Sequence, residues 1–169
     1  MIPTLTTDRL TLGPFSMAQF DAFRAFCATD RSRFLGGPTD NPRDAWDSCM
    51  QGLGQWIARG YGAFFLTETA TGKPVGRVQL RHPIDLDEPE LAWVVYEDFE
   101  GKGLAQEAVL AVRAYAYDTL GFAPLMSLIA PDNTRSLALA KKLGCVPHGA
   151  KTYDDAPSVT IYRHPGGTT

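Results

Sequence analysis

The sequence predicts one mixed α+β domain, in which a central sheet carries helices on both faces. The predicted order of elements, β-α-α-β-β-β-α-β-α-β-β, is neither a repeating βαβ pattern nor an all-β pattern. The chain has 169 residues, of which 44% are hydrophobic and 21% charged, as in ordinary globular domains. We therefore expect a single domain over residues 1–165, followed by a flexible tail at residues 166–169.

The N-terminal third predicts one strand and two helices. Residues 9–15, RLTLGPF, alternate weakly between polar and apolar side chains and suit a short strand. Ser16 is a suitable N-cap for a helix that runs to about residue 29, where apolar residues recur at helical spacing. After a turn rich in glycine and proline, Asn41 can cap a second helix over residues 42–58, with Pro42 at its first position.

The middle of the chain has the pattern of strands. Residues 62–69 and 74–81 are two apolar runs joined by the turn sequence ATGK, which predicts a hairpin. Residues 90–96, ELAWVVY, are almost continuously apolar, which is typical of a strand that is covered on both faces.

Helices and strands alternate in the C-terminal part. A long amphipathic helix is predicted over residues 104–120, with Gly121 at its end, and a buried strand over residues 124–130. A second amphipathic helix covers residues 133–143 and is closed by Gly144, and the last strands end with residues 158–164.

Charge and cysteine content exclude several functions. Sixteen Lys and Arg stand against 19 Asp and Glu, a net charge of -3, so no nucleic acid or membrane partner is expected. We expect a cytoplasmic protein, because the start lacks a signal pattern and no apolar stretch could span a bilayer. Three scattered cysteines without a CxxC pair predict no disulfide framework, and three histidines without ligand spacing predict surface positions and no metal.

The segment EGKGLA, residues 100–105, joins the strand at 90–96 directly to the helix at 104–120. The first N–H groups of a helix have no intrahelical partners, and glycine allows close approach, so this junction suits a phosphate or pyrophosphate. A lone GxG also occurs in ordinary tight turns. The dinucleotide fingerprint fails because Gln106 stands where glycine or alanine is needed, and the P-loop pattern fails because Lys102 lies between the glycines.

A second signature, PDNTRSLALAKKLGC, begins at residue 131. Together with ELAWVVY, EGKGLA and the opening LTTDRLTLGPF, it resembles the GCN5-related N-acetyltransferases (GNAT), in particular the branch of ribosomal-protein N-terminal acetyltransferases. The resemblance covers nearly the whole chain. Gly103 and Ala105 fit the family's phosphate motif, and residues 133–144 fit its N-x-x-S-x(5)-K-x-G pattern, but Glu100 stands where arginine or glutamine is usual.

The resemblance implies a GNAT fold, with a mostly antiparallel twisted sheet of six to seven strands that splays into a V. It also implies acetyl-CoA as the cofactor, with the pyrophosphate on the phosphate turn and the pantetheine arm along the cleft strand. Glu100 is expected to point away from the phosphates, and Lys102 to offset its charge. The implied cofactor-binding residues are Val94, Val95, Tyr96, Gly101, Lys102, Gly103, Leu104, Ala105, Asn133 and Ser136.

The implied activity is transfer of an acetyl group to a primary amine by direct attack in a ternary complex. The attacking nitrogen must be a neutral amine, whereas an alkylammonium is almost wholly protonated at neutral pH, so a base has to accept a proton. Glu90 at the start of the cleft strand matches the branch's acidic residue and is the candidate base. Many relatives protonate the CoA thiolate with a tyrosine, but that position is Ala140 here. Ser136 is the candidate acid, with Tyr153 and Tyr162 as alternatives.

The acceptor site is expected between residues 31–56, 82–88 and 153–158. The acidic residues Asp85, Asp87, Glu88 and Glu90 favour a cationic acceptor, which leaves open a peptide N-terminus, a polyamine or a small metabolite. An alternative is an acyl-CoA-binding or interaction module without turnover, which Glu100 and Ala140 support. A nucleotide-dependent enzyme is a third hypothesis, and either a monomer or a homodimer is compatible with the sequence.

Overall fold

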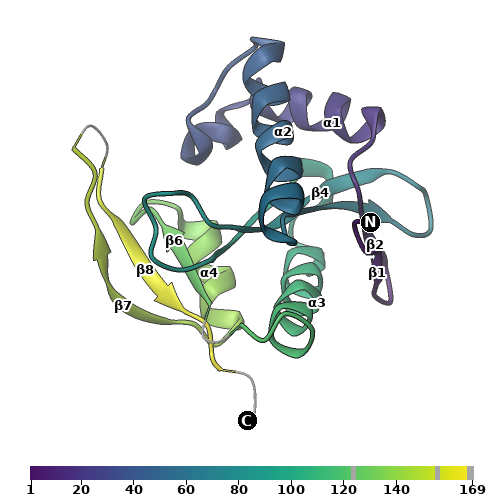
Figure 1. Cartoon of the computed structure of the whole chain (residues 1–169). Coiled ribbons are helices and arrows are strands. Elements are labelled where there is room, and N and C mark those ends of the chain that lie inside the picture. Colours follow the sequence, from purple (N-terminus) through teal and green to yellow (C-terminus); the bar gives the residue numbers. More distant parts are fainter. Residues whose placement is uncertain (123–124, 155–156, 167–169) are drawn as a thin grey trace.

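The computed structural model describes residues 1–122, 125–154 and 157–166, through which one eight-stranded sheet runs (Figure 1). The strand order is β1-β2-β3-β4-β5-β6-β8-β7, and every neighbouring pair is antiparallel except β5 and β6. The strands are β1 Leu5–Thr6, β2 Leu10–Gly13, β3 Ala63–Glu68, β4 Pro74–Arg81, β5 Glu90–Val95, β6 Met126–Ile129, β7 Val146–Lys151 and β8 Val159–Arg163.

The mixed α+β class is confirmed, and the sheet has one strand more than the expected six to seven. The short strand β1 pairs with β2 at the N-terminal edge, where the sequence showed no alternating pattern. Of the tail expected at residues 166–169, residues 167–169 lie outside the described residues, as does residue 124 of the strand expected over residues 124–130.

The helices are α1 Met17–Cys27, α2 Pro42–Arg59, α3 Leu104–Asp118 and α4 Thr134–Lys142, with short 3-10 helices at η1 Asp30–Leu35 and η2 Glu97–Phe99. The expected caps are confirmed. Ser16 Oγ accepts from the N–H of Gln19 at 3.4 Å, and Asn41 Oδ1 accepts from the N–H of Arg43 at 3.1 Å. In the described chain, no helix combines the length and the hydropathy needed to cross a bilayer.

Helices lie on both faces of the sheet, with α1 and α2 on one face and α3 on the other (Figure 1). The close fit of α2 on β3 requires a glycine, because a Cβ atom at Gly52 would lie 2.8 Å from the Cβ of Ala63. On the opposite face the ring of Phe64 meets that of Tyr115 in α3 edge-on, with 5.6 Å between centroids. The sheet therefore has a buried core on each side.

The sheet is nearly divided between β5 and β6. These parallel strands share one pair of partners, Glu90 and Met126, at their N-terminal ends. Beyond that pair the strands separate, and β6, β8 and β7 form a distinct group to one side of the molecule (Figure 1). This is the V-shaped splay that the resemblance implied.

The strand β5 does not pass directly into α3, so that expectation was wrong. The chain forms η2 after Tyr96, where the N–H of Phe99 donates to the Tyr96 carbonyl at 3.0 Å. Phe99 is apolar and only 9% exposed, and burying its ring makes the chain turn once before Glu100. The phosphate turn is therefore residues 100–103, and α3 begins at Leu104.

Candidate active site

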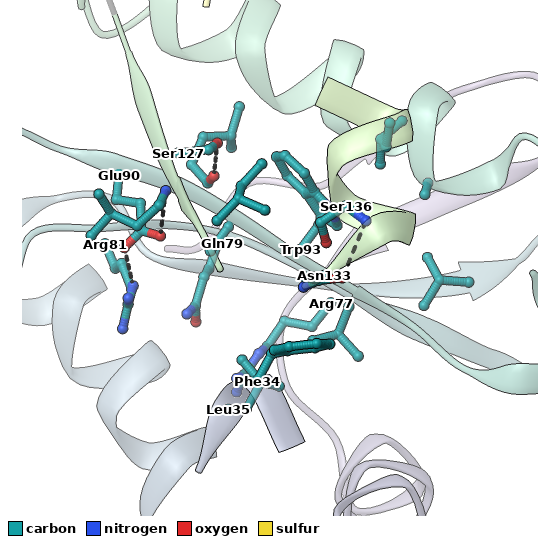
Figure 2. Close-up of a pocket in the computed structure, with 18 of the residues that line it drawn as sticks. Phe34, Leu35, Arg77, Gln79, Arg81, Glu90, Trp93, Ser127, Asn133 and Ser136 are labelled. Carbon is teal, nitrogen blue, oxygen red and sulfur yellow. Dashed lines mark hydrogen bonds and ion pairs between the residues drawn. The ribbon is translucent and has the colours of Figure 1, made fainter. Parts of the chain in front are cut away.

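A cleft of about 1150 Å³ lies along the splay and continues beneath α2 (Figure 2). Its walls come from β4, β5 and β6, from the start of α3 and α4, and from η1 and α2. Typical small-molecule pockets measure about 300–1,000 Å³, so this volume can hold a long cofactor arm together with a second substrate.

The turn before α3 presents a row of free backbone donors. The first intrahelical bond is made by the N–H of Glu107, which donates to the Gly103 carbonyl at 3.1 Å. Within the described chain, none of the N–H groups of residues 101–106 has an acceptor. Gly101 and Gly103 have φ angles of 72° and 78°, which favour glycine, and both line the cleft. Such a row of N–H groups suits a pyrophosphate.

Gly101, Gly103, Leu104 and Ala105 all line the cleft, as the sequence analysis expected, but Lys102 is not among its lining residues. The ammonium of Lys102 donates to the Asp98 carbonyl at 2.7 Å and lies 5.4 Å above the ring centroid of Phe99. Lys102 is therefore occupied by its own turn and does not offset the charge of Glu100.

Two arginines offset Glu100 instead. Arg135 Nη1 lies 3.0 Å from each carboxylate oxygen, and Arg31 forms a second ion pair with the same group. Glu100, Arg31 and Arg135 all line the cleft, so the carboxylate does not simply point to solvent. Two guanidinium groups therefore neutralise the Glu100 carboxylate, and Arg31 also pairs with Glu97 at 3.0 Å, outside the cleft.

The N-terminal segment fixes the phosphate turn from outside. Arg9 donates through Nη1 to the Lys102 carbonyl at 2.8 Å, and through Nε to Glu107 at 2.7 Å. Glu107 also accepts from the Thr7 hydroxyl at 2.6 Å and the Arg9 N–H at 2.9 Å. Burial acts to raise the pKa of Glu107, but the hydrogen bonds from Thr7 and Arg9 outweigh it, and the pKa lies below its usual value. No local signal in the sequence indicated this contact.

Beyond Glu90, one edge of β5 is unpaired and borders the splay. Only every second residue of the strand points its backbone N–H and C=O groups to that edge. The N–H of Tyr96 donates to the Val75 carbonyl in β4 at 2.8 Å, and the β4–β5 register pairs Val94 with Arg77. Backbone groups alternate in direction along a strand, so those of Trp93 and Val95 point toward β6. Val94, Val95 and Trp93 line the cleft, whereas Tyr96 is not one of its lining residues. The structure thus offers Trp93 in the place where the sequence analysis expected Tyr96.

Asn133 and Ser136 come together at the start of α4 and line the cleft (Figure 2). Asn133 Oδ1 accepts from the N–H of Ser136 at 3.2 Å, so this asparagine caps the helix. The other polar groups of both side chains remain available to a ligand. Figure 2 shows both residues on the opposite side of the cleft from Glu90.

Glu90 lies at the closed end of the splay and is only 2% exposed. Its Oε2 forms an ion pair with Arg81 Nε at 2.6 Å, and its Oε1 accepts from the N–H of Leu128 at 3.3 Å (Figure 2). These contacts orient a carboxylate at the one point where the two halves of the sheet meet.

A row of buried, hydrogen-bonded polar side chains lies beside Glu90 and was not predicted from the sequence. Ser127 Oγ donates to the Leu91 carbonyl and lies 2.9 Å from His164 Nε2, and His164 Nδ1 lies 3.4 Å from Cys145 Sγ. The surface position expected for His164 is wrong, because this side chain is 2% exposed. Burial, with the nearby charge of Arg113, lowers the pKa of His164 to about 4. A single serine within the apolar run PLMSLIA was the one available signal.

The acidic loop that favoured a cationic acceptor is largely neutralised. Glu88 pairs with Arg163, and Asp85 pairs with Lys151 at 3.5 Å. Of the three segments expected around the acceptor, residues 31–56 line much of the cleft, residues 82–88 contribute Pro83, and the described residues of 153–158 contribute none. Neither Tyr153 nor Tyr162 is a lining residue.

Comparisons with known proteins agree with this geometry. A family model described as an acetyltransferase (GNAT) domain matches residues 9–146. The crystal structure of an acetyltransferase from Agrobacterium tumefaciens shares 38% identity, with 98% of this chain and 95% of that chain covered and a TM-score of 0.88. RimL, a ribosomal L7/L12 α-N-protein acetyltransferase, shares the fold at 16% identity, with 97% and 94% covered and a TM-score of 0.76.

Among curated proteins, the uncharacterized N-acetyltransferase YnaD of Bacillus subtilis is 27% identical over 75 residues. That match spans 39% of this chain and 44% of YnaD.

The splayed sheet and the free N–H groups before α3 define an acetyltransferase that takes its acetyl group from acetyl-CoA. The chain belongs to the GNAT acetyltransferase family.

Proposed function

We propose that this protein transfers the acetyl group of acetyl-CoA to a primary amine by direct attack while both substrates occupy the cleft. The supporting observation is the continuity of that cleft. It connects the backbone donors before α3 with the carboxylate of Glu90 and with the chamber beneath α2, which is part of the same cleft. Direct transfer needs both substrates to lie in one continuous space, and positioning of this kind supplies much of a rate enhancement.

Acetyl-CoA would supply an activated thioester, and the phosphate turn would hold its pyrophosphate. The free N–H groups of Gly101, Gly103, Leu104 and Ala105 are suitable donors, and the guanidinium groups of Arg31 and Arg135 provide positive charge nearby. The free edge of β5 at Trp93 and Val95 can pair with the amides of the pantetheine arm, as an added strand would. Asn133 and Ser136 lie along the same arm from the α4 side.

The reaction forms a bond between the amine nitrogen and the acetyl carbon and breaks the bond from that carbon to sulfur. Glu90 would accept the amine proton, directly or through one water, because its carboxylate is oriented by Arg81 and the Leu128 N–H. Ser136 would donate a proton to the departing thiolate. A thiolate is a fair leaving group without help, so we assign the larger effect to Glu90.

The test is a thiol-release assay with acetyl-CoA over a panel of amino acids, polyamines, aminoglycosides and peptides, with acetylated products identified by mass spectrometry. We expect acceptor-dependent release of CoA and an N-acetyl product. Acetyl-CoA, but neither ATP nor NAD, should raise the melting temperature of the protein. Binding of acetyl-CoA without transfer to any amine would contradict the proposal and favour the acyl-CoA-binding module without turnover.

A further inference from the structure

Arg77 places a buried positive charge in the wall of the cleft without a carboxylate beside it. Its side chain projects from β4, and the residue is 4% exposed. The guanidinium donates to the backbone carbonyl of Ser48 at 3.2 Å and to its hydroxyl at 3.1 Å, and lies 4.4 Å from the ring centroid of Phe23. Among the described residues, no Asp or Glu lies within ion-pair distance of Arg77.

Burying a charge without a counter-ion costs free energy, and for Arg77 this cost appears as a shift of its pKa. Burial lowers the pKa of Arg77, even though arginine resists deprotonation more than any other side chain. Ser48 and the Phe23 ring offset part of that cost but provide no formal negative charge. A guanidinium has five N–H donors in a planar arrangement that matches a carboxylate, and the contacts with Ser48 use two of them.

The β4–β5 register places Arg77 on the face of the sheet that forms the floor of the chamber beneath α2. The facing pairs are Arg77 with Val94, Gln79 with Ala92, and Arg81 with Glu90, and all six residues line the cleft. At one end of this floor Glu90 neutralises Arg81. At the other end Arg77 has no carboxylate partner among the described residues, and Figure 2 shows it near Phe34 and Leu35. The small side chain of Ala92 leaves room between the two ends.

The acidic residues of the chamber do not neutralise Arg77. Asp44 and Asp47 line the cleft from α2, but Asp44 accepts from the Thr39 hydroxyl at 2.7 Å and from the Asn41 amide at 3.0 Å, at the start of that helix. A second polar group near Arg77 has no hydrogen-bond partner among the described residues. The buried hydroxyl of Tyr96 has no hydrogen bond within the described chain, and the Arg77 charge acts on it, although burial dominates and raises the pKa of Tyr96.

We propose that Arg77 binds a carboxylate of the acceptor, so that the substrate is a small amine carrying a carboxylate, such as a free amino acid. The inference rests on the proposed amine acetylation. Ala92 and Arg77 lie two residues apart in register, roughly 7 Å along the strands. An amine above Ala92 would be close to both the splay and Glu90, with its carboxylate a few bonds away at Arg77. Polyamines carry no carboxylate, and the N-terminal residue of a peptide has its carboxyl group bound in an amide. Neither acceptor would therefore place a carboxylate at Arg77.

The experiment compares matched acceptors that differ only in the carboxylate. Values of kcat/KM are measured by thiol release for the common L-amino acids and for their carboxamides, with the same panel of polyamines and peptides. We expect the preferred amino acid to exceed its amide by about 30-fold or more, as for other buried charge pairs. In Arg77→Met this ratio should fall to near one, and Arg77→Lys should restore part of it.

Controls separate recognition from folding. Arg24→Met removes one exposed positive charge from α1, away from the cleft, and should leave the ratio unchanged. If Arg77→Met does not fold, Arg77→Lys keeps the charge but loses the planar pairing and should still reduce the ratio. The affinity for acetyl-CoA should be the same in every folded variant.

The two proposals can fail separately. If the wild-type protein acetylates amides, polyamines or peptides with the same kcat/KM as amino acids, the carboxylate assignment is overturned. Amine acetylation then still stands. If no amine in the panel is acetylated, both proposals fail.

Discussion

Arg135 donates to both carboxylate oxygens of Glu100, 3.0 Å from each, and so joins the start of α4 to the turn before α3. Glu100 stands where the family usually has arginine or glutamine. The pairing explains how an acid is tolerated beside a phosphate site, because both Arg135 and Arg31 neutralise the carboxylate.

The pair predicts that Glu100→Gln strengthens acetyl-CoA binding. Removing the carboxylate frees Arg135 for the phosphates and releases Arg31 from one of its two carboxylate partners. Because these side chains are partly exposed, we expect the dissociation constant to fall by only about two- to fivefold. Isothermal titration calorimetry measures it directly. Glu97→Gln is the matched control, since Glu97 also pairs with Arg31 but does not line the cleft. A tenfold weakening in Glu100→Gln would show instead that the carboxylate is needed to position the arginines.

Glu90→Gln should reduce kcat by about 10²- to 10⁴-fold, the usual range for loss of a general base, with little change in acetyl-CoA affinity. The glutamine keeps the shape of the side chain but is a poor proton acceptor. Ser136→Ala should have a smaller effect, because the thiolate leaves readily. Steady-state rates at saturating acetyl-CoA test both variants, with Glu68→Gln at the end of β3, outside the cleft, as the control. Unchanged turnover in Glu90→Gln would remove Glu90 from the chemistry and leave the family assignment intact.

Arg9→Ala should loosen the phosphate turn from a distance. The change removes the bonds to the Lys102 carbonyl and to Glu107, and we expect acetyl-CoA to bind roughly tenfold more weakly, equivalent to about 1.4 kcal/mol. The exposed Arg24→Ala is the control. Wild-type affinity in Arg9→Ala would mean that the turn holds its shape without the N-terminal segment.

The same contact predicts a dependence of stability on acid. The pKa of Glu107 is lowered in the folded protein, so its stabilising effect is complete above the ordinary carboxyl pKa. It is lost as the pH falls from there through the lower folded value. Urea unfolding between pH 6 and pH 3 should therefore show a smaller loss of stability in Glu107→Gln than in the wild type.

We expect His164 to cause a second loss of folding stability in acid, which begins at a higher pH than the loss caused by Glu107. The His164 pKa of about 4 in the folded protein lies below the ordinary value of 6.5. The contribution of the neutral imidazole to stability is therefore complete above pH 6.5 and is lost as the pH drops toward 4. Between pH 7.5 and pH 4.5 this amounts to about 2–3 kcal/mol. His164→Asn can retain a hydrogen bond to Ser127 and should lack this loss. Equal acid sensitivity of the two proteins by urea unfolding would contradict the buried, neutral imidazole.

Local chemistry made much of the fold predictable. Ser16 and Asn41 are helix caps whose hydrogen bonds reach two or three residues along the chain, so the sequence alone identified them. The glycines of the phosphate turn were recognisable for the same reason. The 3-10 turn at η2 was missed because it depends on the burial of Phe99 in the tertiary structure.

The missed parts of the site are contacts between residues far apart in the chain. Arg9 meets Glu107 and Ser127 meets His164, and neither partner shows a pattern that identifies the other. The acidic loop was misleading for a related reason. Its carboxylates are visible in the sequence, but the cations that neutralise Glu88 and Asp85 come from β8 and β7.

The single residue pair between β5 and β6 has a consequence for the lifetime of the protein. Because so little backbone pairing joins β6, β8 and β7 to the other strands, this C-terminal group should detach readily from the rest of the sheet. A pantetheine arm lying along the edge of β5 would add the missing contacts, and a ligand that binds the folded state alone stabilises it by mass action. Resistance to cellular proteases would then rise and fall with the supply of acetyl-CoA, so that the amount of enzyme follows the amount of its substrate.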